Sequence, residues 1–132
     1  MNDLRLISLA AEAMENSYNR YSHFAVGAAL LCADGSVYTG CNIENSAFSA
    51  TVCAERTAFF KAISDGKRGF VKLAVVGGKD GDISRPCMPC GVCRQVMSEF
   101  CDKDFCIVTL KDGVPQSHTL DELLPHAFED ML

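Results

Sequence analysis

The sequence predicts an α/β protein, a three-layer α/β/α sandwich built on a mixed sheet of about five strands. The chain has 132 residues, which is enough for one hydrophobic core without a stabilising metal. Helical and extended patterns alternate along it in the order α-β-β-α-β-α-β-β-α. No repeat or linker interrupts residues 1–132, so we expect a single domain.

The first elements are a helix followed by a β-hairpin. Residues 3–17 carry apolar side chains at helical spacing, and Asn2 or Asp3 can cap this helix. Residues 24–32 and 37–43 are largely apolar and flank the turn sequence Ala-Asp-Gly-Ser. An Asp-Gly turn between two such runs predicts two antiparallel strands.

The middle of the chain predicts two helices separated by a buried strand. Residues 51–66 follow a helical pattern, with Thr51 available as the N-cap and a glycine at the end. The run 73–78 is short and apolar throughout, as expected for a strand that is covered on both faces. Residues 89–100 predict the second helix, because Pro89 suits a first helical turn.

A second hairpin and a short helix complete the predicted fold. Residues 105–110 form an apolar run, and the Lys-Asp-Gly turn after it leads to a short strand near Val114. The sequence T-x-x-E at residues 119–122 is a capping box, which marks the start of a last helix.

Charge and hydropathy narrow the range of partners. The net charge is −5, and the basic residues are scattered rather than clustered, which argues against a nucleic-acid partner. No stretch approaches the ~20 apolar residues that cross a membrane. The N-terminal helix contains acidic residues and does not resemble a secretory signal. We therefore expect a cytoplasmic protein that acts on a small molecule.

The chain contains eight cysteines, which is many for its length. A disulfide framework is one interpretation, but a chain of this size with no export signal favours reduced thiols and a metal site. Four of the cysteines lie in or beside apolar runs and are interpreted as small core residues: Cys32, Cys41, Cys101 and Cys106.

The other four cysteines are candidate metal ligands. Cys90 and Cys93 lie three residues apart at the start of a predicted helix, whose N-terminus favours thiolates, while Cys87 lies on the loop before it. Cys53 occupies the matching position in the other central helix. If these helices leave adjacent strands, three thiolates converge and leave a fourth position for water, the pattern of a catalytic zinc site.

Two charged residues accompany Cys53. Glu55 can reach a water bound at the metal and exchange protons with it, although a carboxylate in a first helical turn also has a purely structural explanation. Arg56 lies on the same face as Cys53 and can donate hydrogen bonds to the thiolates, or it can simply face the solvent. The catalytic interpretation is favoured for both residues.

The motifs C-A-E (53–55) and P-C-G-V-C-R-Q (89–95) resemble those of the cytidine deaminase family, in its small homotetrameric branch with three cysteine ligands. The resemblance extends over residues 21–30, 40–66, 89–100 and 122–128. It implies hydrolytic deamination of cytidine and 2′-deoxycytidine to the corresponding uridines with release of ammonia. It also implies one zinc ion per subunit and active sites at the interfaces of a homotetramer.

The resemblance also implies a role for each site residue. Cys53, Cys90 and Cys93 should hold the zinc. Glu55 should move protons, and Arg56 should bond to the thiolates. The implied substrate contacts are Asn42 and Glu44 to the 3′-hydroxyl of the sugar, Phe24 against the pyrimidine ring, the backbone of Ala54 and Cys90 at the polar edge of the base, and Phe128 from a neighbouring subunit.

Several alternatives remain open. Cys87 could complete a closed four-thiolate site, which would make the protein a zinc-stabilised binding module without activity. The substrate could instead be a nucleic acid or a nucleoside antibiotic. Phe24 could be a core aromatic residue, and Asn42 with Glu44 could be solvated residues at the end of a strand. Phe48 stands where many family members have tyrosine.

Overall fold

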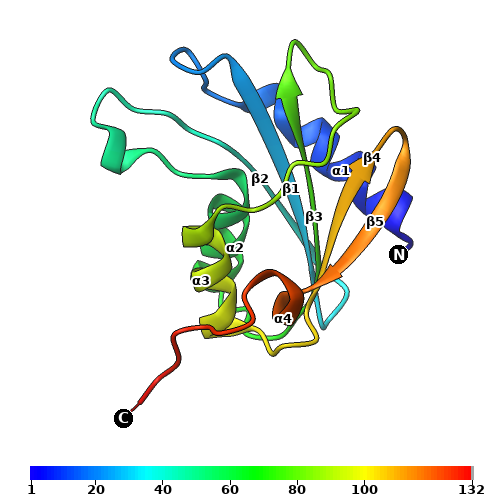
Figure 1. Ribbon diagram of the computed structural model, residues 1–132, viewed down its shortest axis with the longest axis vertical. Coiled ribbons are helices and arrows are strands. Elements are labelled where there is room, and N and C mark those ends of the chain that lie inside the picture. Colours follow the sequence, from blue (N-terminus) through cyan, green and yellow to red (C-terminus); the bar gives the residue numbers. More distant parts are fainter. Residues whose placement is uncertain (132) are drawn as a thin grey trace.

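A computed structural model describes residues 1–131 of the chain (Figure 1). The strands are β1 (Phe24–Cys32), β2 (Val37–Cys41), β3 (Phe70–Lys79), β4 (Cys106–Lys111) and β5 (Val114–Thr119). The α-helices are α1 (Asp3–Ala13), α2 (Ala54–Ser64), α3 (Gly91–Phe100) and α4 (Leu120–Leu123), and the 3-10 helices are η1 (Met14–Asn16) and η2 (Phe48–Ala50).

The five strands form one mixed sheet in the order β2-β1-β3-β4-β5. β3 and β4 are parallel, and the other three neighbouring pairs are antiparallel. The short apolar run in the middle of the chain is β3, which has both β1 and β4 as neighbours. The predicted mixed sheet is therefore confirmed, with β3 at its centre.

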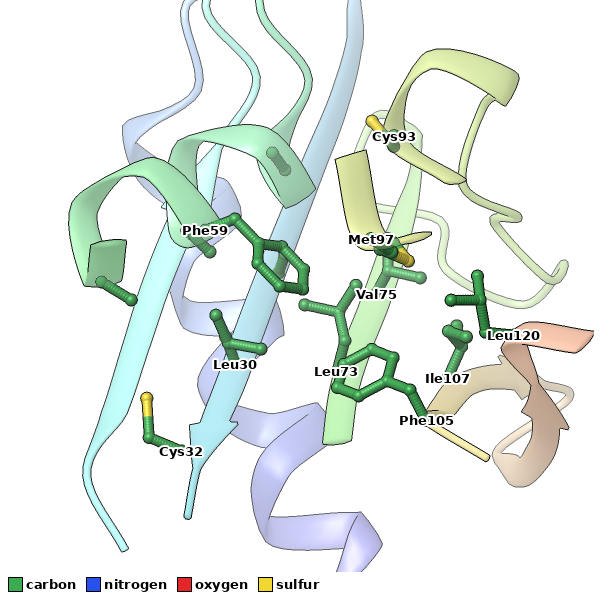
Figure 2. Packing of buried hydrophobic residues seen from close by; sticks show 14 residues of the cluster. Leu30, Cys32, Phe59, Leu73, Val75, Cys93, Met97, Phe105, Ile107 and Leu120 are labelled. Carbon is green, nitrogen blue, oxygen red and sulfur yellow. The ribbon is translucent and has the colours of Figure 1, made fainter. Parts of the chain in front are cut away.

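Helices cover both faces of the sheet, which confirms the predicted three layers. α1 packs on one face through Leu6, Ile7 and Ala10, against residues of β1, β3 and β4. α2 and α3 lie side by side on the opposite face (Figure 1). The larger core lies beneath them, where Phe59 of α2 and Met97 of α3 point toward the sheet (Figure 2). This packing fixes the positions of the two helix N-termini.

A close approach between β2 and α2 depends on Gly40. A Cβ atom at this position would lie 2.5 Å from the carbonyl oxygen of Ala54 and 2.6 Å from the backbone nitrogen of Ala58. Both contacts are with backbone, so the helix itself would have to move. Gly40 therefore lets the first turn of α2 lie directly against the sheet.

Replacing Gly40 by alanine should consequently destabilise the protein by about 1–3 kcal/mol, the usual cost of overpacking a core. Gly91→Ala is the matched control, because a Cβ at Gly91 meets nothing within 4 Å. We expect that variant to be as stable as the parent protein, or slightly more stable. Urea unfolding of the two variants measures the difference, and equal midpoints would show that α2 is not held so tightly.

The starts of two predicted helices and the end of a third are wrong by a few residues, since the helix expected over residues 3–17 ends at Ala13. The helix expected over residues 51–66 begins at Ala54, because Val52 is extended and exchanges backbone hydrogen bonds with Ile43. Cys53 rather than Thr51 is its N-cap. Pro89 precedes the N-cap of α3 instead of lying in its first turn. The helix that starts at the Thr119 capping box has only four residues.

Candidate active site

Three thiols meet where the N-termini of α2 and α3 converge. Cys53 is the N-cap of α2, Cys90 is the N-cap of α3, and Cys93 lies in the first turn of α3. The sulfur atoms of Cys53 and Cys90 are 3.7 Å apart, and those of Cys90 and Cys93 are 3.5 Å apart. The structure thus brings together the three predicted metal ligands, from segments 37 residues apart in sequence.

The strands that lead into α2 and α3 are arranged differently from the expectation that they are adjacent. The strands that precede the two helices, β2 and β3, are not adjacent, because β1 lies between them. Since β1 is antiparallel to both, β2 and β3 run in the same direction and end at the same edge of the sheet. That edge is where α/β proteins commonly place their sites.

The thiol cluster has the dimensions of a zinc site. A Zn–S bond of about 2.3 Å in tetrahedral geometry separates neighbouring sulfurs by roughly 3.8 Å. The three sulfur atoms all lie within 4.8 Å of one another, and two of the separations are 3.7 and 3.5 Å. Neither capping thiol is used for a side-chain cap hydrogen bond, so both are available as ligands. The residues present fit one zinc ion.

Charge around the cluster favours thiolate. Hydrogen bonding from the Cys93 thiol, together with that from the guanidinium of Arg56, lowers the pKa of Cys53 to about 5. Nη2 of Arg56 lies 3.3 Å from the Cys53 sulfur. The pKa of Cys93 is raised by its hydrogen bond to Cys53 and by burial. The positive charge of Arg56 therefore lies next to the Cys53 sulfur, where it can balance the negative charge of the thiolates.

Glu55 is the buried carboxyl group of this site. It is the second residue of α2, and its side chain is only 4% exposed. Burial raises its pKa to about 7. A carboxyl group with such a pKa can both accept and donate a proton near neutral pH, which is what general acid–base catalysis requires.

A cavity of about 320 Å³ connects the thiols with the residues predicted to bind substrate. Its wall includes Cys53, Ala54, Glu55 and Cys90, together with Phe24, Asn42 and Glu44. Phe24 therefore lines the cavity instead of lying inside the hydrophobic core. Asn42 is buried, with 9% of its surface exposed, and is not a solvated residue at the end of a strand. A space of this size suits a small organic ligand.

The amide of Asn42 is oriented by its surroundings. Its Oδ1 accepts hydrogen bonds from the Ser17 hydroxyl and from the backbone N–H of Val26, the latter at 2.9 Å. Its Nδ2 donates to the carbonyl oxygen of Phe24 at 2.8 Å. Both acceptor positions of the oxygen are used, and one N–H remains. Asn42 can therefore offer a ligand one donor.

Comparison with known proteins decides the family. The family model described as "Cytidine and deoxycytidylate deaminase zinc-binding region" matches residues 1–109. The chain belongs to this family. A protein named cytidine deaminase from Sporosarcina psychrophila is 53% identical over 125 residues, which are 94% of this chain and 89% of that protein. Another, from Halalkalibacterium halodurans, is 51% identical over 99% of this chain and 98% of its own.

A solved structure gives the same result for the fold of this deaminase. The crystal structure of cytidine deaminase from Burkholderia pseudomallei superimposes with a TM-score of 0.89 at 42% identity. The match covers 97% of this chain and all of the other. The mixed five-stranded sheet and its helices are thus the fold of solved cytidine deaminases. No helix within residues 1–131 of the chain is long and apolar enough to cross a bilayer.

Cys87 of the deaminase stands apart from the three ligands. Its side chain lines the cavity but is not among the sulfurs that gather within 4.8 Å. Burial raises the pKa of its thiol to about 12, and the negative charge of Glu55 adds to this effect. What separates Cys87 from the three ligands is its position, because its sulfur does not lie in the group that the other three sulfurs form. The closed four-thiolate site considered from the sequence is therefore not the arrangement seen.

Substitution of Cys87 by serine should consequently leave zinc binding unchanged. We expect one zinc per chain in both the variant and the parent, measured by atomic emission on the purified proteins. A variant that purifies without zinc would restore the closed site and the binding-module interpretation.

Phe128 is the one predicted contact that lies away from the cavity. Its side chain is 74% exposed, and its backbone carbonyl accepts a hydrogen bond from Nε2 of Gln95 at 3.0 Å. Within one chain it does not reach the ligand cavity.

Sequence reasoning missed three residues that hold the site together. Arg94 donates to the carbonyl oxygens of Pro89 and Leu123, which ties the loop before α3 to the last helix. Ser17 supports Asn42, and Ser22 supports Glu44. For Ser22 one signal was available, because a serine two residues before a strand commonly bonds to the backbone. The bond from Ser17 joins residues 25 apart, which spacing does not reveal.

Proposed function

We propose that this protein catalyses the hydrolytic deamination of cytidine and 2′-deoxycytidine to uridine and 2′-deoxyuridine, with release of ammonia. The observation that carries the proposal is a buried carboxyl group, Glu55, in the same cavity as a three-thiol cluster of zinc dimensions. Relatives named cytidine deaminase, 51–53% identical over most of the chain, support the choice of substrate.

Cys53, Cys90 and Cys93 would hold the zinc, with the charge of the thiolates balanced by Arg56. Zinc held in this way supplies Lewis-acid chemistry, which lowers the pKa of a bound water toward neutrality. The positions of the cysteines at the starts of α2 and α3, and the hydrogen bond from Arg56 to Cys53, support this role for the three sulfurs.

Glu55 would act as the proton carrier. It takes one proton from the attacking water and delivers it to N3 of the base while the water oxygen bonds to C4. It then takes the remaining hydroxyl proton and delivers it to the amino group, so that the C4–N bond breaks and ammonia leaves. The product retains a proton on N3 and a carbonyl at C4. A carboxyl with its pKa near 7 is suited to both transfers.

The cavity wall supplies contacts for the rest of the nucleoside. We assign the free N–H of Asn42 and the carboxylate of Glu44 to the 3′-hydroxyl, and the ring of Phe24 to the face of the pyrimidine. The backbone N–H of Ala54 belongs to the first turn of α2, where such groups have no partner within the helix. We assign it, together with the backbone of Cys90, to the polar edge of the base.

We also propose a cytoplasmic homotetramer with one zinc ion per subunit. The exposed ring of Phe128, which cannot reach its own cavity, supports active sites that are completed by a neighbouring subunit. The charge of −5 gives no reason to expect a nucleic-acid partner.

The proposal is tested by a panel of substrates. The zinc-loaded protein should release ammonia from cytidine and from 2′-deoxycytidine, and far less from cytosine and adenosine. Cytosine lacks the sugar, and adenosine presents a larger base. Activity confined to a different nucleoside, or none with any of the four, would overturn the assignment.

A further inference from the structure

The carboxylate of Glu44 is held by a turn that precedes β1. Its Oε1 accepts hydrogen bonds from the backbone N–H groups of Tyr21 and Ser22, both at 3.0 Å. Its Oε2 accepts a bond from the hydroxyl of Ser22. Three donors, all 22 or 23 residues away in sequence, therefore fix the direction of this carboxylate.

The Ser22 hydroxyl can donate its proton only toward Glu44. Oγ of Ser22 accepts a hydrogen bond from the backbone N–H of Phe24 at 3.0 Å, so its single proton points toward Glu44. His23, between them, has a positive φ of 56° and donates its backbone N–H to the carbonyl oxygen of Asn19 at 2.8 Å. This left-handed residue turns the chain so that Ser22 bridges Glu44 and the first residue of β1.

Glu44 and Asn42 retain little hydrogen-bonding capacity for a ligand. A carboxylate offers about four acceptor positions, and the turn occupies three of those on Glu44. Asn42 retains one N–H, as described above. The two side chains together leave one acceptor and one donor, which is what a single hydroxyl group needs.

We propose that Ser22 is a positioning residue that restricts Glu44, which acts together with Asn42, to reading one sugar hydroxyl. This inference rests on the 3′-hydroxyl contact under the proposed function and extends it. It accounts for acceptance of both cytidine and 2′-deoxycytidine, because no capacity on these two side chains is left for a 2′-hydroxyl. Ser22 lines the cavity but acts through Glu44.

The test uses two substrates that differ only at the 3′ position, 2′-deoxycytidine and 2′,3′-dideoxycytidine. In Ser22→Ala, kcat/KM for 2′-deoxycytidine should fall about 10-fold, mainly through a higher KM, as expected for losing one hydrogen bond to a charged group. The same substitution should change kcat/KM for 2′,3′-dideoxycytidine less than about 2-fold. Ser22→Thr keeps the hydroxyl and should restore most of the loss.

Ser36→Ala is the matched control. Ser36 makes the same pair of bonds to the carboxylate of Asp34, from its hydroxyl at 2.6 Å and its backbone N–H at 3.0 Å, but on the turn between β1 and β2. It should leave both substrates unaffected. Equal losses with both substrates in Ser22→Ala, or no loss with 2′-deoxycytidine, would overturn the role assigned to Ser22.

A second measurement does not depend on the substrate. The Ser22 hydroxyl bond is the main reason that the pKa of Glu44 lies below its usual range. NMR titration of the Glu44 carboxyl carbon should therefore show a higher pKa in Ser22→Ala than in the parent, and no change in Ser36→Ala. An unchanged pKa would show that the Ser22 hydroxyl does not hold the Glu44 carboxylate. If the parent enzyme treats the two substrates alike, the proposed 3′-hydroxyl contact fails instead, and the titration still decides what Ser22 does.

Discussion

Glu55→Gln should lower kcat for cytidine by about 10³-fold, within the range that general acid–base groups contribute. Glutamine has the same shape but cannot take a proton from water or return one to the amine. Because Glu55 lies in the cavity without being one of the clustered sulfur ligands, the variant should bind as much zinc as the parent. Steady-state assays and metal analysis on the same preparation measure both quantities.

Glu99→Gln provides the comparison for this substitution. Glu99 lies on the exposed side of α3, so the same chemical change there removes one surface charge and nothing from the cavity. We expect its kcat to equal that of the parent. If the Glu55→Gln enzyme retains more than a tenth of the parent activity, Glu55 does not carry the protons in the reaction.

The second large effect concerns the zinc ligands. Cys90→Ser should weaken zinc binding by more than about 100-fold, because even residues that only support a ligand contribute 10–100-fold. Activity should fall in proportion to the zinc that is lost. Competition with a chromophoric chelator gives the affinity, and the same samples give the activity.

Cys106→Ser is the corresponding control, since Cys106 lies on β4 and is not part of the cluster. Its zinc affinity should match that of the parent. The fold should survive in both variants, because neither Cys90 nor Cys106 is among the buried residues that make up the two hydrophobic cores. Far-UV circular dichroism checks this, and an unfolded Cys90→Ser protein would show that zinc is needed for the fold itself.

Much of the fold was predictable because local patterns agree with the global packing. The strand expected over residues 24–32 has those limits in β1, since an apolar run ends there at an Asp-Gly turn. The capping box at Thr119 forms as predicted. The helix after it is short because Pro125 forces Leu124 out of the helical region.

The errors arise where distant segments decide the local conformation. Val52 is extended because it pairs with Ile43, which no helical pattern within residues 51–66 could reveal. The expected adjacency of the strands before α2 and α3 was wrong, because the order of strands is a property of the whole sheet. The three cysteines still converge as predicted, since β2 and β3 end at the same edge of the sheet.

The substrate side of the site was less accessible to sequence reasoning than the metal side. Cysteine spacing and a helix start indicate thiolate ligands directly. The orientations of Asn42 and Glu44 depend instead on bonds from Ser17, Ser22 and backbone groups far along the chain. Such contacts leave no periodic trace in a sequence, and they become visible only once the turn before β1 is placed.

The central claim is that one zinc ion at Cys53, Cys90 and Cys93 serves the reaction at Glu55. It is tested most directly by adding zinc stepwise to metal-free protein while cytidine deamination is measured in the same samples. We predict that activity rises linearly and stops rising at one zinc per chain. Full activity without zinc, or a full equivalent bound with no deamination, would contradict the account.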